Sequence, residues 1–338
     1  MAALVAAIRR YREHPVRRPP GDPPVIWREG SSRLLDHGGR SDAPVMLIVP
    51  SLVNRHTVLD LCPERSFVGL LRQEGLRPLV VDWGLPDAAE RRFDLTAYVL
   101  RLERALDATL ASSGKPVVLA GYCMGGLLAT ALATRRSEAV AALALLATPW
   151  DFHAEAATQA RMLAASLPLL EAMIGPDGAA PAELLQTLFF AIDPFAVVGK
   201  FLRFGALPAG DPAEAPFVLL EDWLADGVPL AGPVFRECVE GWYGRNDPLQ
   251  GSWRIAGEPV DPTSLRLPTL IAAPARDRIV PPGSAAALAQ IIPGAVSLTP
   301  PLGHVGMVAG RSAHEHVARP LASWILSALR GCGEGGTP

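Results

Sequence analysis

The feature that most restricts the fold of this chain is a cysteine placed between a buried strand and a helix of small residues. Residues 116–120 predict a strand covered on both faces, and residues 127–133 predict a helix. Residues 121–126, Gly-Tyr-Cys-Met-Gly-Gly, join the two. Small residues on both sides of the cysteine let helix and strand approach at a sharp, strained turn. This pattern predicts a nucleophile elbow carrying Cys123, with a packed core thiol as the alternative. The elbow glycines are Gly121, Gly125 and Gly126.

Strand and helix patterns alternate along the rest of the chain. Continuous apolar runs predict strands buried on both faces at residues 45–49 and 79–81, and further strands are predicted at residues 140–146, 268–273 and 295–298. Apolar residues at helical spacing predict helices at residues 65–74, 95–110, 284–292 and 313–329. Repeated β-loop-α units predict an α/β protein with a doubly wound, mainly parallel sheet covered by helices on both faces, as in the α/β-hydrolase fold.

The alternation stops in the middle of the chain. Residues 151–264 carry many aromatic residues and prolines but few strand signals, so we expect a mostly helical cap inserted into the sheet domain. The catalytic core then comprises residues 45–150 and 265–330. Residues 1–44 are rich in Pro, Gly and Arg and predict an irregular N-terminal segment, and residues 331–338 predict a flexible tail.

An acid and a histidine follow the elbow in the chain order of an α/β hydrolase, which is nucleophile, acid, histidine. Asp277 follows one predicted strand, and His304 follows the next. We expect His304 to act as general base and acid and Asp277 to orient its ring. Asp82, at the end of the strand at residues 79–81, is a competing acid. The other six histidines lack a position directly after a late strand.

Two backbone N–H groups are expected to form an oxyanion hole. The first belongs to Met124, directly after the nucleophile. The second comes from the loop after the first core strand and belongs to Leu52 or Val53. Tyr122 and Phe235 are candidates to line the substrate pocket, although core packing is the usual fate of such side chains.

Composition excludes several other classes of function. Lys and Arg number 31 against 34 Asp and Glu, so the chain has no basic excess for binding nucleic acid. The four cysteines are far apart and show no metal-ligand spacing, which favours a reduced, cytoplasmic protein without a metal site. The longest apolar run, residues 139–150, is too short to cross a bilayer, and the N-terminus does not have the order of a signal peptide.

Several longer motifs extend over residues 45–330 and resemble the poly(3-hydroxyalkanoate) synthases. The resemblance is closest to the short synthases that work with a second subunit, although Met124 stands where that type tends to have a bulky polar residue. The long N-terminal domain of the larger synthases has no counterpart in these 338 residues. The motifs are Asn54-Arg-His-Thr-Val-Leu-Asp60-Leu-Cys-Pro-Glu-Arg-Ser66, Val81-Asp-Trp-Gly-Leu-Pro-Asp87, Gly121-Tyr-Cys-Met-Gly-Gly126, Tyr243-Gly-Arg-Asn246-Asp-Pro-Leu249, Asp277-Arg-Ile-Val-Pro-Pro282 and Gly303-His-Val-Gly306.

The resemblance implies an acyltransferase that polymerises 3-hydroxyacyl-CoA into a polyhydroxyalkanoate and releases coenzyme A, without a separate cofactor. Cys123 would carry the acyl group, His304 would activate Cys123 or the incoming hydroxyl, and Asp277 would assist that proton transfer. The implied partners are the growing polyester chain or a granule surface in the cytoplasm, and a second synthase subunit or a second copy. The same three residues would also suit a depolymerase or an acyl-thioesterase, and a non-catalytic granule-associated protein is a third hypothesis.

Overall fold

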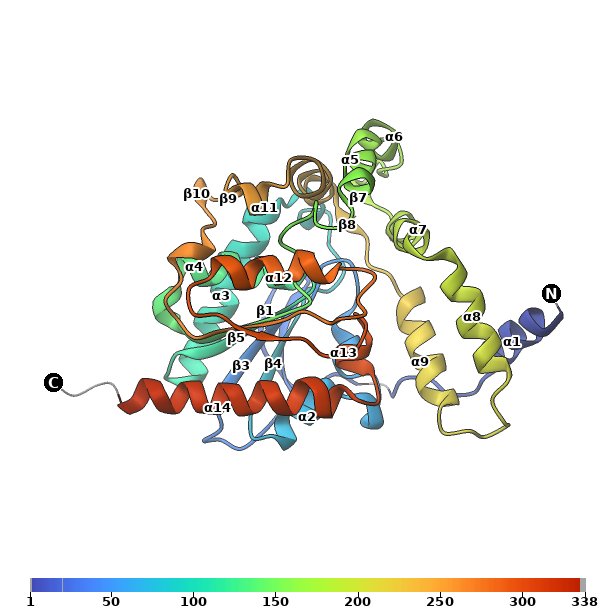
Figure 1. Cartoon of the computed structure of the whole chain (residues 1–338), viewed down its shortest axis with the longest axis horizontal. Coiled ribbons are helices and arrows are strands. Elements are labelled where there is room, and N and C mark those ends of the chain that lie inside the picture. The colour runs from blue at the N-terminus through green and yellow to red at the C-terminus, as the bar shows by residue number, and fades with distance from the viewer. Residues whose placement is uncertain (1, 20, 335–338) are drawn as a thin grey trace.

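An eight-stranded sheet organises the molecule (Figure 1). The computed structural model describes residues 2–19 and 21–334. The strand order is β1-β2-β4-β3-β5-β6-β11-β12, and the six strands from β4 to β12 are mutually parallel. This confirms the predicted mainly parallel sheet. The strands are β1 (Val25–Glu29), β2 (Ser32–Asp36), β3 (Val45–Val49), β4 (Arg77–Asp82), β5 (Val117–Tyr122), β6 (Val140–Leu146), β11 (Thr269–Ala272) and β12 (Val296–Leu298).

Helices cover both faces of the sheet because each central strand is apolar on both sides. Along β3, Leu47 and Val49 enter one core cluster and Met46 and Ile48 enter the other. Side chains alternate across a strand, so such continuous apolar runs need cover on each face. The first cluster is closed by α3 (Leu95–Ser113), α4 (Met124–Arg135) and α12 (Pro282–Ile291). The second is closed by α2 (Phe67–Gln73), α13 (Gly306–Ala309) and α14 (Arg319–Glu334).

The segment between β6 and β11 is mostly helical. Figure 1 shows α7, α8 and α9 standing at the side of the sheet, close to the N-terminal helix. The helices of this segment are α5 (Ala157–Ala165), α6 (Leu167–Glu171), α7 (Ala182–Ile192), α8 (Pro194–Gly205), α9 (Glu214–Ala225), α10 (Gly232–Arg236), the π-helix η5 (Glu237–Arg245) and α11 (Asp247–Gln250). A two-stranded antiparallel sheet of β7 (Ala179–Ala180) and β8 (Leu230–Ala231) and a small hairpin of β9 (Arg254–Ile255) and β10 (Glu258–Pro259) complete it.

The N-terminal segment is more ordered than we predicted. Instead of an irregular approach, the chain forms α1 (Ala2–Arg12) and a hairpin of β1 and β2 that adds two antiparallel strands to the sheet beside β4. The hairpin turns at Gly30, whose φ of 56° suits glycine. The prediction was wrong because the hydrogen bonds that hold β2 come from β4, about 45 residues further along the chain, and local composition does not reveal them.

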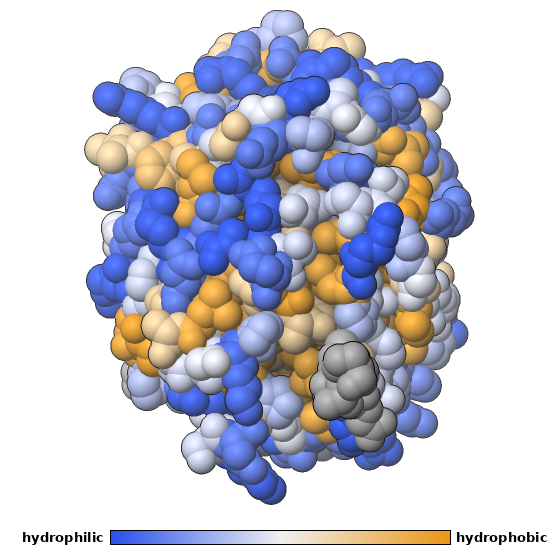
Figure 2. Space-filling view, turned by 90° about the vertical axis from the view of Figure 1, so that its left-hand side faces the viewer, coloured by the Kyte–Doolittle hydropathy of each residue, from blue (hydrophilic) through white to orange (hydrophobic). Residues whose placement is uncertain are grey.

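The C-terminal prediction also needs correction. The last helix, α14, continues to Glu334, so residues 331–334 are helical rather than part of a flexible tail. Residues 335–338 lie outside the described part of the chain. Figure 2 views the end of the molecule where this terminus lies and shows hydrophilic residues interspersed with small apolar patches.

Among the described residues, no single helix is long and apolar enough to span a membrane. Residues 182–192 and 197–205 pass that test only as a pair, with a bend of 86° between them.

Candidate active site

The elbow cysteine sits at a strained turn between β5 and α4. Cys123 has φ 55° and ψ −128°, a backbone conformation that L-residues rarely adopt. Its N–H donates to Leu146 O at 2.9 Å, and its carbonyl accepts from Gly126 N at 2.9 Å. These hydrogen bonds fix the turn at the carboxyl edge of the sheet, where the Cys123 thiol is half-buried.

The elbow glycines are needed because helix and sheet touch there. A methyl group at Gly126 would lie 1.8 Å from Thr148 Oγ1, and one at Gly125 would lie 2.1 Å from Val49 O. At Gly121 it would lie 2.3 Å from the Cα atom of Gly126. No side chain fits at such distances. The sequence pattern that predicted the elbow therefore reflects a real steric demand.

His304 and Asp277 form a buried pair on the loops after β12 and β11. The two atoms His304 Nδ1 and Asp277 Oδ2 are 2.7 Å apart. The other carboxylate oxygen of Asp277 accepts from the N–H groups of Ile279 and Val280, each at 2.9 Å. Asp277 is thus held from its own loop, and it fixes the orientation of the His304 ring.

The His304 ring also lies within electrostatic reach of Cys123. Burial by itself lowers the pKa of His304, but the interactions with Cys123 and Asp277 outweigh it and raise that pKa to about 10. An imidazolium beside a thiol favours the thiolate. The structure thus brings the three predicted residues together, with the charges that suit a nucleophilic cysteine.

Asp82, the competing acid, has other partners. It accepts from Arg33 Nε at 2.9 Å, and its Oδ1 lies 3.1 Å from His56 Nδ1. Burial raises the pKa of Asp82, but the interactions with His56 and Arg33 lower it by more, so its pKa lies well below the usual range. This carboxylate belongs to a separate ion-pair network, and Asp277 is the acid that serves His304.

The predicted oxyanion loop, residues 50–54, follows β3, which pairs with β5 beside the elbow. Gly125 packs directly on the carbonyls of Val49 and Pro50, so the start of α4 and this loop adjoin. Between the two predicted donors, Val53 gives its N–H to Ser51 Oγ at 3.4 Å. We therefore favour Leu52 as the partner of Met124.

Neither of the two pocket candidates is left free by the structure. The Tyr122 hydroxyl donates to His304 O at 3.2 Å, and the two rings lie 5.1 Å apart between centroids. Tyr122 therefore packs against the histidine and does not line open space. Phe235 is buried in the core cluster beside α3 and α4. For both side chains, packing is the better description.

One residue near the thiol was not predicted from the sequence as part of the site. Tyr243 lies on the π-helix η5, and its ring contacts Phe152 at 5.0 Å between centroids. Burial raises the pKa of Tyr243, as do the charges of Cys238 and Cys123, so its hydroxyl lies within electrostatic reach of Cys123. The motif containing Tyr243 was visible in the sequence, but nothing local shows that η5 brings this side chain within electrostatic reach of Cys123.

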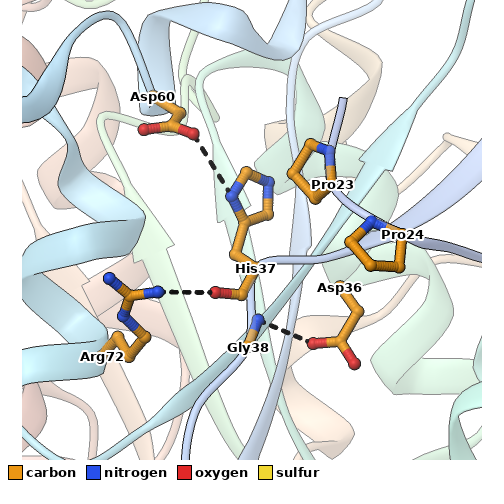
Figure 3. A pocket seen from close by; sticks show the side chains of 7 residues that line it. All are labelled: Pro23, Pro24, Asp36, His37, Gly38, Asp60 and Arg72. Atoms are coloured by element: carbon orange, nitrogen blue, oxygen red, sulfur yellow. Dashed lines mark hydrogen bonds and ion pairs between the residues drawn. The ribbon is translucent and has the colours of Figure 1, made fainter. Parts of the chain in front are cut away.

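An open pocket lies at the amino end of β4, whereas Cys123 lies at the carboxyl edge of the sheet (Figure 3). Its volume is about 390 Å³, and His37 within it points to Asp60, with 3.4 Å between Nδ1 and Oδ2. Pro78, at the start of β4, accepts the N–H of His37. The pocket therefore adjoins the amino end of that strand. Within the described ranges, no cluster of three or more His, Cys, Asp or Glu side chains could hold a metal ion.

Comparison with known proteins agrees with this geometry. Residues 34–318 match the model of the alpha/beta hydrolase family. The poly(3-hydroxyalkanoate) polymerase subunit PhaC of Haloferax mediterranei is 28% identical over 310 residues, covering 89% of this chain and 63% of the relative. PhaC of Allochromatium vinosum is 29% identical over 287 residues, with 83% and 80% covered. PhaC of Cupriavidus necator is 30% identical over 306 residues, with 85% and 50% covered. The chain thus spans between half and four fifths of these relatives.

Solved structures show the same fold at lower sequence identity. A hydrolase from Pseudomonas aeruginosa superposes with a TM-score of 0.55 and 17% identity, covering 92% of this chain and 99% of that structure. The meta-cleavage product hydrolase of Pseudomonas fluorescens gives 0.53 and 18% identity, covering 88% and 94%. The chain therefore belongs to the α/β hydrolase family, and it is similar in sequence to several curated proteins named poly(3-hydroxyalkanoate) polymerase subunits.

Proposed function

We propose that this chain is an acyltransferase that joins 3-hydroxyacyl groups from coenzyme A thioesters into a polyester. The observation that carries the proposal is the elbow cysteine, which lies within electrostatic reach of a histidine that a buried aspartate orients. The relatives named as polymerases supply the substrate class. We further propose that the chain works in the cytoplasm and needs no cofactor, since the coenzyme A thioester is its substrate.

The first half-reaction loads the enzyme. The Cys123 thiolate attacks the thioester carbonyl, and the N–H groups of Met124 and Leu52 stabilise the oxyanion that forms. The carbon–sulfur bond to coenzyme A then breaks, and the leaving thiolate takes the proton from the His304 imidazolium. The products are an acyl-Cys123 thioester, a neutral His304 and free coenzyme A.

The second half-reaction makes the ester bond. The hydroxyl of another 3-hydroxyacyl group gives its proton to His304 and attacks acyl-Cys123, which releases the thiolate and restores the ion pair. Cysteine suits this cycle because exchange between two thioesters is nearly thermoneutral. Water must be kept from acyl-Cys123, and η5, which brings Tyr243 near the thiol, would contribute to that exclusion.

The cap segment presents a surface that suits an apolar partner. Several large apolar side chains there are exposed, including Phe195 at 84%, Leu169 at 70% and Met162 at 67%. Concentrations of such side chains mark contact surfaces. We propose that this face meets the growing polyester or granule, or a second synthase subunit or second copy of the chain.

The test is an assay of coenzyme A release from 3-hydroxybutyryl-CoA, with analysis of the product and with Cys123→Ala as the comparison. We expect release with polymer formation by the wild type and no release by the variant. Free 3-hydroxybutyrate in place of polymer would instead indicate a hydrolase. Equal release by Cys123→Ala would refute the assigned nucleophile, and no release by either would favour a non-catalytic role.

A further inference from the structure

We propose that cap helix α9 positions the oxyanion loop, with Trp223 as the positioning residue, and that the N-terminal helix α1 clamps α9 in the active arrangement. The inference rests on the proposed acyl transfer at Cys123. The inference connects α1 and α9 with the backbone N–H donor of the oxyanion loop.

The carboxyl end of α9 is bonded to Arg55, the residue directly after the oxyanion loop, and the chain beyond α9 is bonded to the loop itself. Trp223 is buried, and its indole Nε1 donates to Arg55 O at 2.8 Å. The Arg55 guanidinium lies 3.3 Å from Asp226, one residue after α9. Beyond it, Val228 N donates to Val53 O at 3.4 Å, and a β-bridge joins residues 54 and 227. Consecutive residues 53–55 are therefore held by one short segment of the cap.

The other side of the same loop is anchored to the sheet. His56 pairs with Asp82 at the end of β4, with 3.1 Å between Nδ1 and Oδ1. Asp82 is itself fixed by Arg33 and by the N–H of Gly84 at 3.0 Å. The oxyanion loop thus bridges a rigid strand end and a cap helix. A displacement of α9 would move residues 52–55 relative to Met124, whose N–H is fixed by the start of α4.

Helix α1 contacts both halves of α9. Arg10 donates to Leu207 O at 2.7 Å and Pro208 O at 3.0 Å, just after α8, and pairs with Glu214 on α9 at 2.6 Å. The Tyr11 hydroxyl donates to Asp222 Oδ1 at 2.7 Å, one residue before Trp223.

Close packing supports the clamp. A methyl group at Gly205 on α8 would lie 2.7 Å from the Cβ atom of Ala7 on α1. The guanidinium of Arg10 also lies 5.3 Å from the centroid of the Phe204 ring. Figure 1 shows α1 beside α8, with α9 next in the row. Contacts therefore run without a break from α1 through α9 to the oxyanion loop.

This link has a kinetic consequence. Loss of one oxyanion donor lowers kcat about 10²- to 10³-fold in enzymes of this type, and a donor that is only displaced should cost about 10-fold. Alkylation of a thiolate by iodoacetamide forms no oxyanion. Disturbing the link should therefore slow acyl transfer without slowing alkylation of Cys123.

The experiment uses Trp223→Phe, which removes the indole N–H and keeps an aromatic ring. Trp253→Phe is the matched control, because Trp253 is also buried and its Nε1 has no hydrogen-bond partner among the described residues. For both variants we would measure kcat and KM for coenzyme A release from 3-hydroxybutyryl-CoA, the nitrophenol burst from p-nitrophenyl butyrate, and the alkylation rate of Cys123. Tyr11→Phe tests the clamp in the same assays.

For Trp223→Phe we expect kcat and the burst rate to fall about 10-fold, with KM and alkylation changing less than about twofold. Tyr11→Phe should fall in the same direction, and Trp253→Phe should match the wild type. Unchanged kcat and burst rate in Trp223→Phe would overturn the inference. An alkylation rate that falls in proportion to kcat would also overturn it, because α9 would then control access to Cys123 and not the position of the oxyanion donor. If the wild type gives a burst but releases no coenzyme A, the proposed function fails while the burst and alkylation still test the link.

Discussion

The raised pKa of His304, which lies within electrostatic reach of Cys123, predicts an unusual pH dependence of cysteine reactivity. The pKa of His304 is raised to about 10, so at pH 8 about 99% of it would be protonated, against about 3% for an unperturbed histidine. Asp277 faces the other side of the ring, and Tyr122 and Tyr243 also lie near the pair. The imidazolium should therefore be present over the whole neutral range.

We expect the rate of Cys123 alkylation by iodoacetamide to vary less than about threefold between about pH 6.5 and 9. An unassisted thiol with a pKa near 8.5 would accelerate roughly 50- to 100-fold over that range. The assay is mass spectrometry of the peptide that contains Cys123, with the Cys62 peptide as an internal comparison, since burial raises the pKa of Cys62. His304→Ala should restore the steep dependence of Cys123.

The same raised pKa affects stability, with a definite sign. The contribution of protonated His304 to the free energy of unfolding is complete below its unfolded pKa of about 6.5 and is lost as pH rises through about 10. If the alkylation rate of Cys123 in the wild type rises with pH as steeply as in His304→Ala, the proposed effect of His304 on Cys123 is refuted.

Three further predictions follow from single side chains. Gly126→Ala should lower the free energy of unfolding by about 1–3 kcal/mol or prevent folding, as measured by urea denaturation, because its methyl group would collide with buried Thr148; unchanged stability would contradict the packing of the elbow. Asp277→Asn should lower kcat for coenzyme A release about 10³-fold or more, because the amide no longer favours the productive His304 tautomer; a loss below tenfold would remove Asp277 from the site. Asp82→Asn should reduce the loss of stability on acidification, because the depressed pKa of Asp82 contributes stability present above about pH 4 and lost below it; an acid-unfolding profile identical to the wild type would contradict that pairing.

The part of the fold that depends on local pattern could be predicted from the sequence. Each buried parallel strand is an uninterrupted apolar run, and the elbow glycines are dictated by contacts within one strand-turn-helix unit. Asp277 and His304 could be predicted because parallel strands bring the loops that follow them to one edge of the sheet. Asp82 also follows a parallel strand, but it precedes the elbow cysteine in the chain, and the structure pairs it with His56 and Arg33 instead.

The parts that could not be predicted depend on contacts between distant segments. The β1–β2 hairpin is stabilised by antiparallel pairing with β4, and α1 by packing against α8. The contact of Trp223 with Arg55 joins residues 168 positions apart, and neither residue carries a local sign of it. The position of Tyr243 on η5, within electrostatic reach of Cys123, is of the same kind.

The most direct test of the central claim is the mass of the protein after brief incubation with 3-hydroxybutyryl-CoA. We predict that the wild type gains one or more 3-hydroxybutyryl units, that peptide mapping places them on Cys123, and that Cys123→Ala gains none. An adduct on another residue, or no adduct on a wild type that still releases coenzyme A, would contradict covalent catalysis by Cys123.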